Sequence, residues 1–329
     1  MAGQGNAQCR GLLVTGGSGF VGRALLEQLV ANPAWAPRAL VRQWPAQQLA
    51  GVDYRLFGEL AAVDAVSGHF ELVDTVIHLA SRVHVMQETA TDPLAEFRRV
   101  NVDGTLSLAR SAAQAGVRRF IFVSSVKVNG ESTDDRAPFT ADEVPAPLDP
   151  YGISKREAEE GLRQLATQTG LEVVIVRPVL VYGPGVKANF RSMMNWLNRG
   201  LPLPFGAIHN KRSLVALDNL VDLLVTCIDH PAAANQTFLA SDGHDLSTTE
   251  LLQRLGQALG KPARLLPVPA IWLKSAAMLA GKGALSRRLC GSLQVDIDKT
   301  REMLGWKPPL DVDQALRATA INFLKEQDK

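Results

Sequence analysis

The sequence is poor in cysteine and carries almost no excess charge. Its three cysteines, Cys9, Cys227 and Cys290, are odd in number and far apart, so they suit neither a disulfide framework nor a Cys-x-x-Cys metal or redox pair. This usage predicts a reducing, cytoplasmic location. The formal net charge is only +2 over 329 residues, and no run of Lys or Arg forms a basic stripe. A nucleic-acid partner is therefore not expected.

Long apolar runs are also missing. The N-terminal MAGQGNAQCR is polar and lacks the apolar core of a signal peptide. The most lipophilic later segment, residues 265–281, is interrupted by Pro267, Pro269 and Lys274. It is shorter than the roughly 20 apolar residues that cross a bilayer. We therefore expect no membrane span and predict that this segment is a buried or surface-lying helix.

What the chain does contain is an alternation of apolar runs and helical periodicity. The runs, bounded by glycine, proline or charge, are GLLVTG, RALVR, VDYRLF, LVDTVIHLA, RRFIFVSS and LEVVIVRP. Strands that are apolar throughout, with helices between them, indicate a parallel sheet covered on both faces. The sequence therefore predicts a doubly wound α/β fold of the Rossmann type, with a smaller C-terminal lobe that binds substrate.

The domain boundaries and three helices can be placed in more detail. Alternation lapses after Pro178, so we assign residues 1–178 and about 214–240 to a dinucleotide-binding domain, and 179–213 and 241–329 to the lobe. A strand at 237–240 should rejoin the sheet. One helix is predicted over about 92–115, and two more should begin at the N-caps Asp149 and Ser247. Apolar or small residues at helical spacing support the first: Leu94, Phe97, Val100, Gly104, Leu108 and Ala112.

The segment TGGSGFVG follows the first predicted strand and opens a helix. Gly16 permits a tight turn, Gly19 lets the backbone approach a pyrophosphate, and Gly22 packs the helix on the strand. The helix terminus presents free N–H groups to the anion. A glycine-rich turn without a ligand is the plain alternative, but the strand before and the helix after favour dinucleotide binding.

The end of the second strand bears on the choice between NAD and NADP. An acidic residue there would accept hydrogen bonds from the adenosine ribose, but this strand ends in Arg42, whose guanidinium suits a 2′-phosphate. A solvated surface arginine is the alternative, and Arg38 competes for the same role. We therefore favour NADP(H), with NAD(H) as the other candidate.

Tyr151 and Lys155 lie four residues apart, so one helix face carries both side chains. A tyrosine titrates near 10 in isolation and needs a neighbouring cation to exchange protons at neutral pH. Lys155 supplies that field and can hold the nicotinamide ribose, while Ser125 ends the fifth strand and can hydrogen-bond the reacting oxygen. An incidental surface pair is the alternative. The glycine turn, Ser125 and the helix start fixed by Pro150 argue for a catalytic trio.

The histidines give little support to metal catalysis, and we predict no metal. The six histidines show no paired ligand spacing, and His78 lies inside an apolar strand. His84 could reach a substrate, although a structural histidine is the alternative reading.

Seven motifs occur in order over nearly the whole chain: TGGSGFVG, VIHLAS, NVDGT, FVSS, YGISK, VRPVLVYGPG and LGWKPPL. Together they resemble the extended short-chain dehydrogenases/reductases, the NAD-dependent epimerase/dehydratase family that acts on nucleotide sugars. The resemblance implies a homodimer and a UDP-sugar substrate. Besides the glycines, Arg42, Tyr151 and Lys155, it implies cofactor contacts at Phe20, Val21, Glu59, Leu60, Leu79, Ala80, Ser81, Asn101 and Pro178.

The resemblance also implies a substrate site in the lobe. It places Asn189 on the nucleotide phosphates, Pro204 and Phe205 near the base, and Arg212 on the diphosphate. Arg212 is the strongest of these expectations because a planar guanidinium binds phosphate with two parallel hydrogen bonds. Arg82 and Ser125 complete the implied substrate contacts.

Residues after Ser125 narrow the reaction. Family dehydratases carry Asp-Glu or Asp-Lys there, whereas this chain has Val126-Lys127 and keeps Tyr151. FVSSVKVNGE, HLASRVHVMQETATDP and KRSLVALDNL are similar to bacterial enzymes that reduce the 4-keto group of a UDP-linked 6-deoxy-N-acetylhexosamine to the quinovosamine or fucosamine type, in the synthesis of surface polysaccharide precursors such as the lipopolysaccharide O-antigen.

Two alternatives to this leading reductase reading stay open. A UDP-sugar 4-epimerase, acting on UDP-glucose or UDP-N-acetylglucosamine, would retain NAD and show no net redox change. A non-catalytic NAD(P)-sensing protein would keep the fold, but the retained Tyr151 and Lys155 argue against it.

Overall fold

The computed structural model describes residues 9–58, 67–83, 92–279, 281 and 283–327. Its centre is a seven-stranded sheet in which every neighbouring pair is parallel. The strand order is β3-β2-β1-β4-β5-β6-β9, the doubly wound order that the sequence predicts. The strands are β1 Arg10–Thr15, β2 Trp35–Val41, β3 Asp53–Leu56, β4 Val73–His78, β5 Arg119–Val123, β6 Glu172–Pro178 and β9 Thr237–Ala240.

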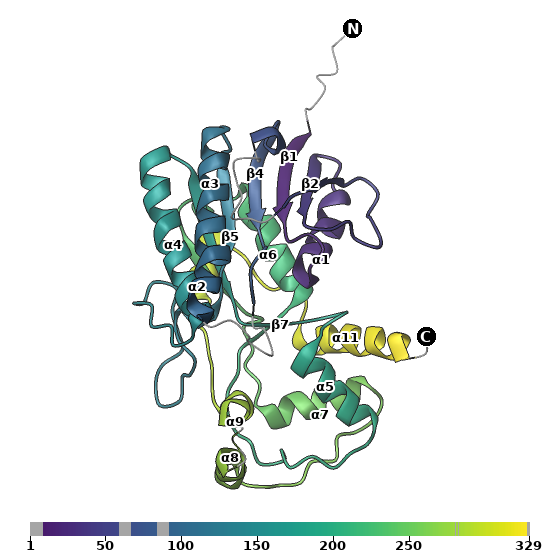
Figure 1. Ribbon diagram of the computed structural model, residues 1–329. Helices are drawn as coiled ribbons and strands as arrows, with labels where there is room; N and C mark the ends of the chain where they lie inside the picture. Colours follow the sequence, from purple (N-terminus) through teal and green to yellow (C-terminus); the bar gives the residue numbers. More distant parts are fainter. Residues whose placement is uncertain (1–8, 59–66, 84–91, 280, 282, 328–329) are drawn as a thin grey trace.

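Helices cover both faces of this sheet, as continuous apolar strands require. One face packs on α1 (Phe20–Val30) and α6 (Leu217–Asp229). The other packs on α3 (Gly104–Gln114) and α4 (Pro150–Thr169), and the two sets lie on opposite sides of the sheet in Figure 1.

The helix predicted over 92–115 is present but not uniform. It runs as α2 (Pro93–Arg98), a π-helical turn (Arg99–Asp103) and α3. The wider turn includes Asn101, and such turns often occur at functional sites.

The lobe lies beyond the carboxyl ends of the parallel strands (Figure 1). Its core is formed by α5 (Ala188–Asn198), α7 (Thr248–Ala258) and α11 (Val312–Gln327). A small parallel pair, β7 (Leu180–Tyr182) and β8 (Leu214–Ala216), connects it to the sheet. Leu304 and Trp306 pack in the core of the Rossmann unit, although the sequence division places them in the lobe. The exact boundary therefore stays a proposal.

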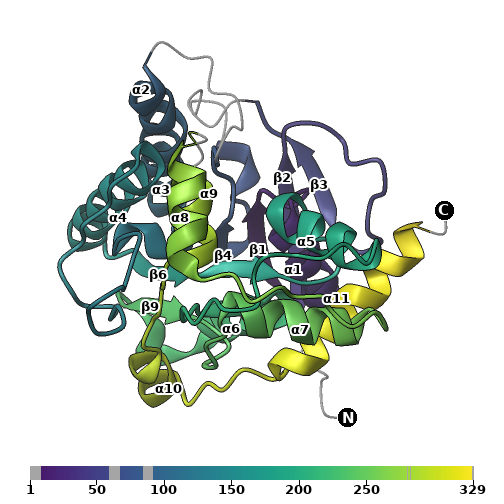
Figure 2. The ribbon, with the colours of Figure 1, turned by 90° about the horizontal axis from the view of Figure 1, so that it is seen from below.

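Three further helices complete the C-terminal third: α8 (Ala270–Leu279), α9 (Gly283–Cys290) and α10 (Asp298–Leu304). Figure 2 shows α8 and α9 lying together on the lobe. The predicted helix in 265–281 is α8, and none of its residues is buried, so the surface-lying alternative is the correct one. Within the described residues, no helix is long and apolar enough to cross a membrane.

The predicted helix caps are confirmed. Asp149 Oδ1 accepts a hydrogen bond from the Gly152 amide at 2.7 Å, and Pro150 is the first helical residue of α4. Ser247 and Glu250 form a reciprocal capping box at the start of α7. These local bonds satisfy backbone donors that would otherwise lack partners.

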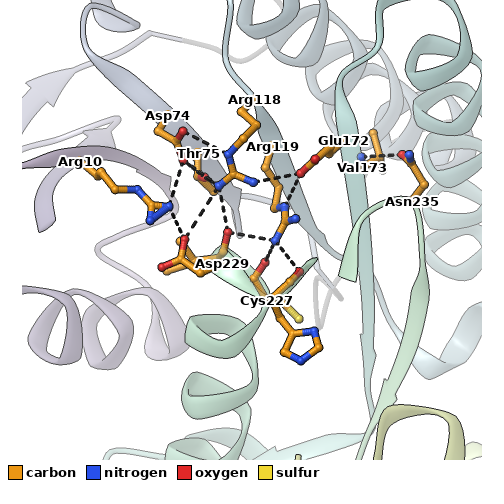
Figure 3. Close-up of polar contacts among 12 residues, drawn as sticks. Arg10, Asp74, Thr75, Arg118, Arg119, Glu172, Val173, Cys227, Asp229 and Asn235 are labelled. Atoms are coloured by element: carbon orange, nitrogen blue, oxygen red, sulfur yellow. Dashed lines mark hydrogen bonds and ion pairs between the residues drawn. The ribbon is translucent and has the colours of Figure 1, made fainter. Parts of the chain in front are cut away.

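An ion network ties the strands together at their amino ends (Figure 3). Arg118, just before β5, binds Asp74 of β4 and Glu172 of β6, the strands on either side of β5. The buried Arg119 binds Glu172 at 2.8 Å and donates to the Cys227 carbonyl at 2.6 Å. A cation at the carboxyl end of a helix is favourable, so Arg119 fixes α6 to the edge of the sheet opposite the lobe.

A second network lies at the carboxyl ends and centres on the fully buried side chains of Glu159 and Arg177. The Glu159 carboxylate on α4 accepts two hydrogen bonds from Arg177 on β6, at 2.8 and 2.6 Å. The carboxylate also accepts a hydrogen bond at 2.6 Å from the hydroxyl of Ser124, which directly follows β5. Arg177 in turn donates to the Asn129 side chain at 3.1 Å. This pairing fixes α4 to two strands.

Glu159→Gln should destabilise the protein by about 3–5 kcal/mol, because it leaves the buried Arg177 without its counter-charge. Glu160→Gln is the matched control. Glu160 pairs with Arg156 on the surface of the same helix, and such a pair contributes roughly 0.3–0.5 kcal/mol. Urea unfolding measures both variants, and equal losses would contradict a special role for Glu159.

Candidate active site

The glycine segment between β1 and α1 adopts the geometry that its sequence predicts. Gly16 has a φ of +72°, in the left-handed region that glycine adopts without strain. A Cβ at Gly22 would lie 2.2 Å from the Gly16 carbonyl oxygen, so only glycine lets α1 lie this close to the turn. A Cβ at Gly19 would lie 3.1 Å from the same oxygen.

The amino end of α1 presents backbone donors to this turn. Gly19 is its N-cap, and within the described chain no side chain caps the helix. Phe20 and Val21 are its first residues and are partly buried. A helix amino end with open N–H groups attracts anions. The uncapped end and its glycine cradle fit the pyrophosphate of a dinucleotide. The Phe20 and Val21 amides would hold it, while Gly19, whose N–H donates to the Gly16 carbonyl, would let the phosphates approach.

Residues that follow β4 border the glycine turn. The Leu79 amide donates to the Thr15 carbonyl at 3.3 Å, and the Ala80 amide donates to the Thr15 hydroxyl at 3.2 Å. A Cβ on Gly16 would meet the Ala80 nitrogen at 2.8 Å. Leu79 and Ala80 therefore lie along the face where the resemblance implies a cofactor.

The two arginines that compete for the cofactor phosphate, Arg38 and Arg42, have different surroundings in the structure. Arg38 donates to Asp53 Oδ2 at 2.9 Å and to the His69 carbonyl, so it holds β3 against β2. Arg42 lies just after β2 and is exposed. Arg42 is thus the arginine at this strand end that is positioned to meet a ligand. Glu59, Leu60 and His84 lie outside the described residues.

Asn101 braces the segment after β4 against the catalytic helix. Its Oδ1 accepts hydrogen bonds from the Arg82 amide at 2.8 Å and the Ser81 hydroxyl at 3.1 Å. Its amide group donates to the Arg82 carbonyl and to the Ser154 hydroxyl, both at 3.0 Å. Ser154 donates to the Tyr151 carbonyl at 2.8 Å. Asn101 thereby sets Ser81 beside the first turn of α4.

The Tyr151 phenol meets two serine hydroxyls. Burial raises its pKa to about 12 and the Asp149 carboxylate adds to this rise, while hydrogen bonds with Ser81 and Ser125 lower it. The structure therefore brings Ser125 and Tyr151 together, as the sequence predicts, and adds Ser81. In the absence of a bound cation the phenol stays protonated at neutral pH.

Lys155 is buried one turn along α4. Its Nζ donates to the Val123 carbonyl at 2.8 Å and lies 4.4 Å from the Phe122 ring centroid. Burial lowers the pKa of Lys155 to about 7, and the attraction of Glu159 only partly opposes this. The Nζ is 6.0 Å from the Tyr151 ring centroid. Tyr151 and Lys155 share one face of α4, as predicted. Burial nevertheless changes the pKa of each group more than the charge of Lys155, which was expected to lower the pKa of Tyr151.

Lys127 pairs with two carboxylates, which the sequence did not reveal. Its Nζ binds the Asp149 carboxylate and, at 3.0 Å, the Glu131 carboxylate. Asp149 raises the pKa of Tyr151. Lys127 therefore offsets the charge that opposes ionisation of the phenol, and we assign it a positioning role behind the site.

His78 is a structural residue. Its Nδ1 lies 2.7 Å from the Thr15 hydroxyl, and its Nε2 lies 3.0 Å from the Thr105 hydroxyl. Burial lowers its pKa to about 3, so the ring is neutral. Among the described residues, no cluster of His, Cys, Asp or Glu is arranged to hold a metal ion.

Arg212 is the most constrained of the proposed substrate residues. It lies between Leu246 and Leu293 in isolated strand pairings and donates to the Gly291 carbonyl at 3.1 Å. Burial lowers its pKa, the Asp134 carboxylate raises it, and Arg288 lowers it. Two guanidinium groups therefore share this part of the lobe. Sequence reasoning missed Arg288, which belongs to none of the seven motifs.

The other proposed substrate and cofactor residues are spread over the lobe and the sheet edge. Asn189 is exposed in the first turn of α5, and Pro204 and Phe205 are partly buried. The Phe205 carbonyl accepts from the Thr249 hydroxyl at 2.6 Å. Pro178 ends β6 and is buried, while Arg82 stacks 5.6 Å from the Phe97 ring centroid. Asn189, Pro204 and Phe205 belong to the lobe, whereas the catalytic trio lies at the carboxyl edge of the sheet.

Asn129, in the Val128-Asn129-Gly130 segment after Lys127, joins the buried network of Glu159 and Arg177. Asn129 is buried; its Oδ1 accepts from Arg177 at 3.1 Å and its amide donates to the Thr140 carbonyl at 2.8 Å. The Asn129 side chain therefore accepts a hydrogen bond from the same arginine that binds Glu159.

A doubly wound sheet, a glycine turn and a Ser-Tyr-Lys trio at the strand ends define a nicotinamide-dependent short-chain oxidoreductase. The chain belongs to the NAD dependent epimerase/dehydratase family, whose model matches residues 12–240. The predicted membership of the extended short-chain dehydrogenases/reductases is confirmed. So is the predicted class of enzyme, an NAD(P)-dependent oxidoreductase or epimerase acting on a nucleotide sugar.

Individual relatives refine this picture. The chain is 48% identical over 325 residues to a UDP-glucose 4-epimerase of Vibrio cholerae, covering 97% of each chain. It is 28% identical over 318 residues to a GDP-6-deoxy-D-mannose reductase of Pseudomonas aeruginosa, covering 93% and 95%. The fold matches that of a Bacillus cereus UDP-glucuronic acid 4-epimerase in complex with NAD, with a TM-score of 0.77 at 19% identity, covering 97% of this chain and all of the other.

Lys155→Met should stabilise the protein at neutral pH while removing a proposed catalytic group. The folded-state pKa of Lys155, about 7, lies below its ordinary value of 10.5. At a pH between these two values, Lys155 loses its proton when the protein folds. This lowers the free energy of unfolding by about 1.4 kcal/mol for each pKa unit of the shift. The gain over wild type should be largest below pH 7 and should vanish toward pH 10.5. Chemical denaturation across this range measures it.

Lys307→Met is the control for this experiment, because Lys307 is exposed. It should leave the free energy of unfolding nearly unchanged at every pH. A constant difference between Lys155→Met and wild type from pH 6 to pH 10.5, a range chosen around the two pKa values, would show that proton release is not the cause.

Lys127→Met should shift the pH dependence of turnover. Without Lys127, the Asp149 charge acts on the Tyr151 phenol unopposed, so the pKa of the phenol rises further. The rate limb that depends on tyrosinate should move to higher pH, whereas Lys127→Arg should restore it. A lower rate with an unmoved limb would indicate a purely structural role.

Proposed function

We propose that this chain is a UDP-sugar 4-epimerase that retains its NAD through the reaction. The observation that carries the proposal is the 48% identity to a UDP-glucose 4-epimerase over 97% of both chains, combined with Ser125, Tyr151 and Lys155 in one site. The sequence alone favours a 4-keto-sugar reductase and keeps the epimerase as the alternative. The relatives reverse that order, because the nucleotide-sugar reductase among them is only 28% identical.

The site residues divide the proton work of this reaction. NAD, held by the glycine turn and the amino end of α1, would supply the acceptor for the C4 hydride of the sugar and then the donor that delivers it to the opposite face. Tyr151 removes the proton of the C4 hydroxyl as the hydride leaves and returns it afterwards. Ser125 hydrogen-bonds the same sugar oxygen and the phenol. A cation in the site favours the tyrosinate, and Lys155 can supply that charge near neutral pH because its pKa is about 7.

Substrate binding is proposed to centre on Arg212. A planar guanidinium suits the paired oxygens of a diphosphate, and the neighbouring Arg288 adds a second positive charge. Asn189, Pro204, Phe205 and Arg82 complete the proposed contacts to the nucleotide and sugar. We further expect a cytoplasmic homodimer, as the resemblance implies.

A second candidate is the NADPH-dependent 4-keto reductase of the surface-polysaccharide type. The observation that favours it is Arg42, exposed at the end of β2 where a carboxylate would select NAD. Its guanidinium suits a 2′-phosphate. Arg42→Asp distinguishes the two cases: it should weaken binding of NADP by roughly ten-fold or more if Arg42 contacts the phosphate, and should leave NAD binding in place.

Purified protein incubated with UDP-glucose or UDP-N-acetylglucosamine should form the galacto epimer without added reductant. Chromatography of the nucleotide sugars measures the conversion. In parallel, UDP-4-keto-6-deoxy-N-acetylglucosamine is supplied with NADPH or NADH, and absorbance of the reduced nicotinamide is followed. Epimer formation without nicotinamide consumption supports the proposal. Stoichiometric oxidation of NADPH with no epimer would favour the reductase.

Tyr151→Phe tests the assignment of the proton carrier. It should lower turnover by about 10²–10⁴-fold, the usual contribution of a positioned acid or base, with little change in cofactor binding. The control Tyr54→Phe removes a hydroxyl that accepts from the Leu49 amide far from the trio and should retain most activity. Full activity in Tyr151→Phe would overturn the catalytic assignment.

A further inference from the structure

Helix α8 exposes an apolar surface that the proposed reaction does not use. Four of its large side chains are mainly in solvent: Ile271 at 65%, Trp272 at 71%, Met278 at 76% and Leu279 at 91% exposure. None of the ten residues of α8 is buried. Single exposed apolar residues are common, but a cluster of large ones on one helix marks an interaction site.

The four side chains share one face of the helix. Ile271 and Met278 are seven residues apart, as are Trp272 and Leu279, and seven residues are about two turns. The two pairs are one position apart and form a continuous stripe. Leu273 and Ala277, on the opposite side, are only partly exposed, and α8 packs on α9. The helix therefore turns its apolar face outward.

The sequence around this helix carries charge of one sign only. From Leu251 to Val295 the sequence contains no Asp or Glu. It contains seven cations: Arg254, Lys261, Arg264, Lys274, Lys282, Arg287 and Arg288. The whole chain has a net charge of only +2, so the remainder carries a net charge of −5. Lys274, at the edge of the apolar stripe, and Arg287, on α9, are exposed. Asp134 lies near this helix, because Lys274 contributes to the lowered pKa of its carboxyl group.

We propose that α8 lies flat on the surface of an anionic phospholipid bilayer, with its apolar stripe in the headgroup region and its neighbouring cations on lipid phosphates. An apolar face with a tryptophan and flanking Lys or Arg is the pattern of an interfacial helix. Ten residues span only about 15 Å, half of a bilayer core, so α8 docks and does not cross.

Charge complementarity selects lipid over a second copy of this chain. A symmetric contact through α8 would bring Lys274 and Arg287 against the same residues of the other copy. Like charges facing each other oppose such a contact, whereas an anionic bilayer attracts every one of them.

The docked surface is continuous with the proposed substrate region. The Gly291 amide donates to the Arg287 carbonyl at 2.9 Å, and the Gly291 carbonyl accepts from Arg212 at 3.1 Å. The chain therefore passes directly from α9 to the Arg212 backbone pairing. The docking itself does not depend on which sugar reaction the site performs.

Vesicle co-sedimentation of the full chain tests the proposal. Vesicles of phosphatidylglycerol and phosphatidylethanolamine should bind the protein, pure phosphatidylcholine vesicles should bind it much less, and high salt should weaken binding. Trp272→Ser/Leu279→Ser should reduce the bound fraction at least ten-fold. Lys274→Gln/Arg287→Gln should weaken binding roughly five-fold for each cation removed.

Val144→Ser/Ile321→Ser is the matched control, because both residues are exposed apolar side chains outside α8. It should bind vesicles like wild type. Circular dichroism and turnover in vesicle-free buffer should be unchanged in every variant, which separates this proposal from the proposed reaction. Absence of binding to anionic vesicles would overturn the proposal that α8 docks on a membrane. Self-association that Trp272→Ser/Leu279→Ser abolishes, without vesicle binding, would instead assign the face to a second copy.

Discussion

The buried carboxylate of Glu159 is the contact on which the geometry of the site depends. It lies one turn beyond Lys155 on α4 and binds Arg177 of β6 and the Ser124 hydroxyl beside Ser125. Two strands and the catalytic helix therefore meet at one ion pair. Because a buried charge without its partner is costly, the network permits one placement of α4 against the sheet. That placement brings Tyr151 to Ser125.

Burial sets the protonation states of the site. Desolvation raises the pKa of Tyr151 to about 12 and lowers that of Lys155 to about 7. Both shifts favour neutral groups, so the site holds a phenol and an amine that is close to losing its proton. Asp149 opposes ionisation of the phenol, and Lys127 offsets Asp149. The protonation states of Tyr151 and Lys155 therefore depend on the charge of the ligand that binds in the site.

Local sequence patterns predicted the fold and the centre of the site. The Gly16 turn, the Asp149 cap and the four-residue spacing of Tyr151 and Lys155 are decided within a few residues, so sequence alone is enough. The contacts of Ser81, Lys127 and Arg288 are not local. Each depends on how separate segments meet in space, which spacing does not report. For the same reason, the apolar content of residues 265–281 predicts a helix without deciding whether that helix is buried or lies on the surface.

The central claim is that one site removes a hydride from a sugar carbon and returns it to the same carbon. The most direct measurement uses UDP-glucose labelled with deuterium at C4 of the sugar, without added nicotinamide. The account predicts UDP-galactose that keeps the deuterium at C4, as followed by mass spectrometry and NMR. Product that has lost the label, or product that forms only when NADPH is supplied and consumed, would contradict it.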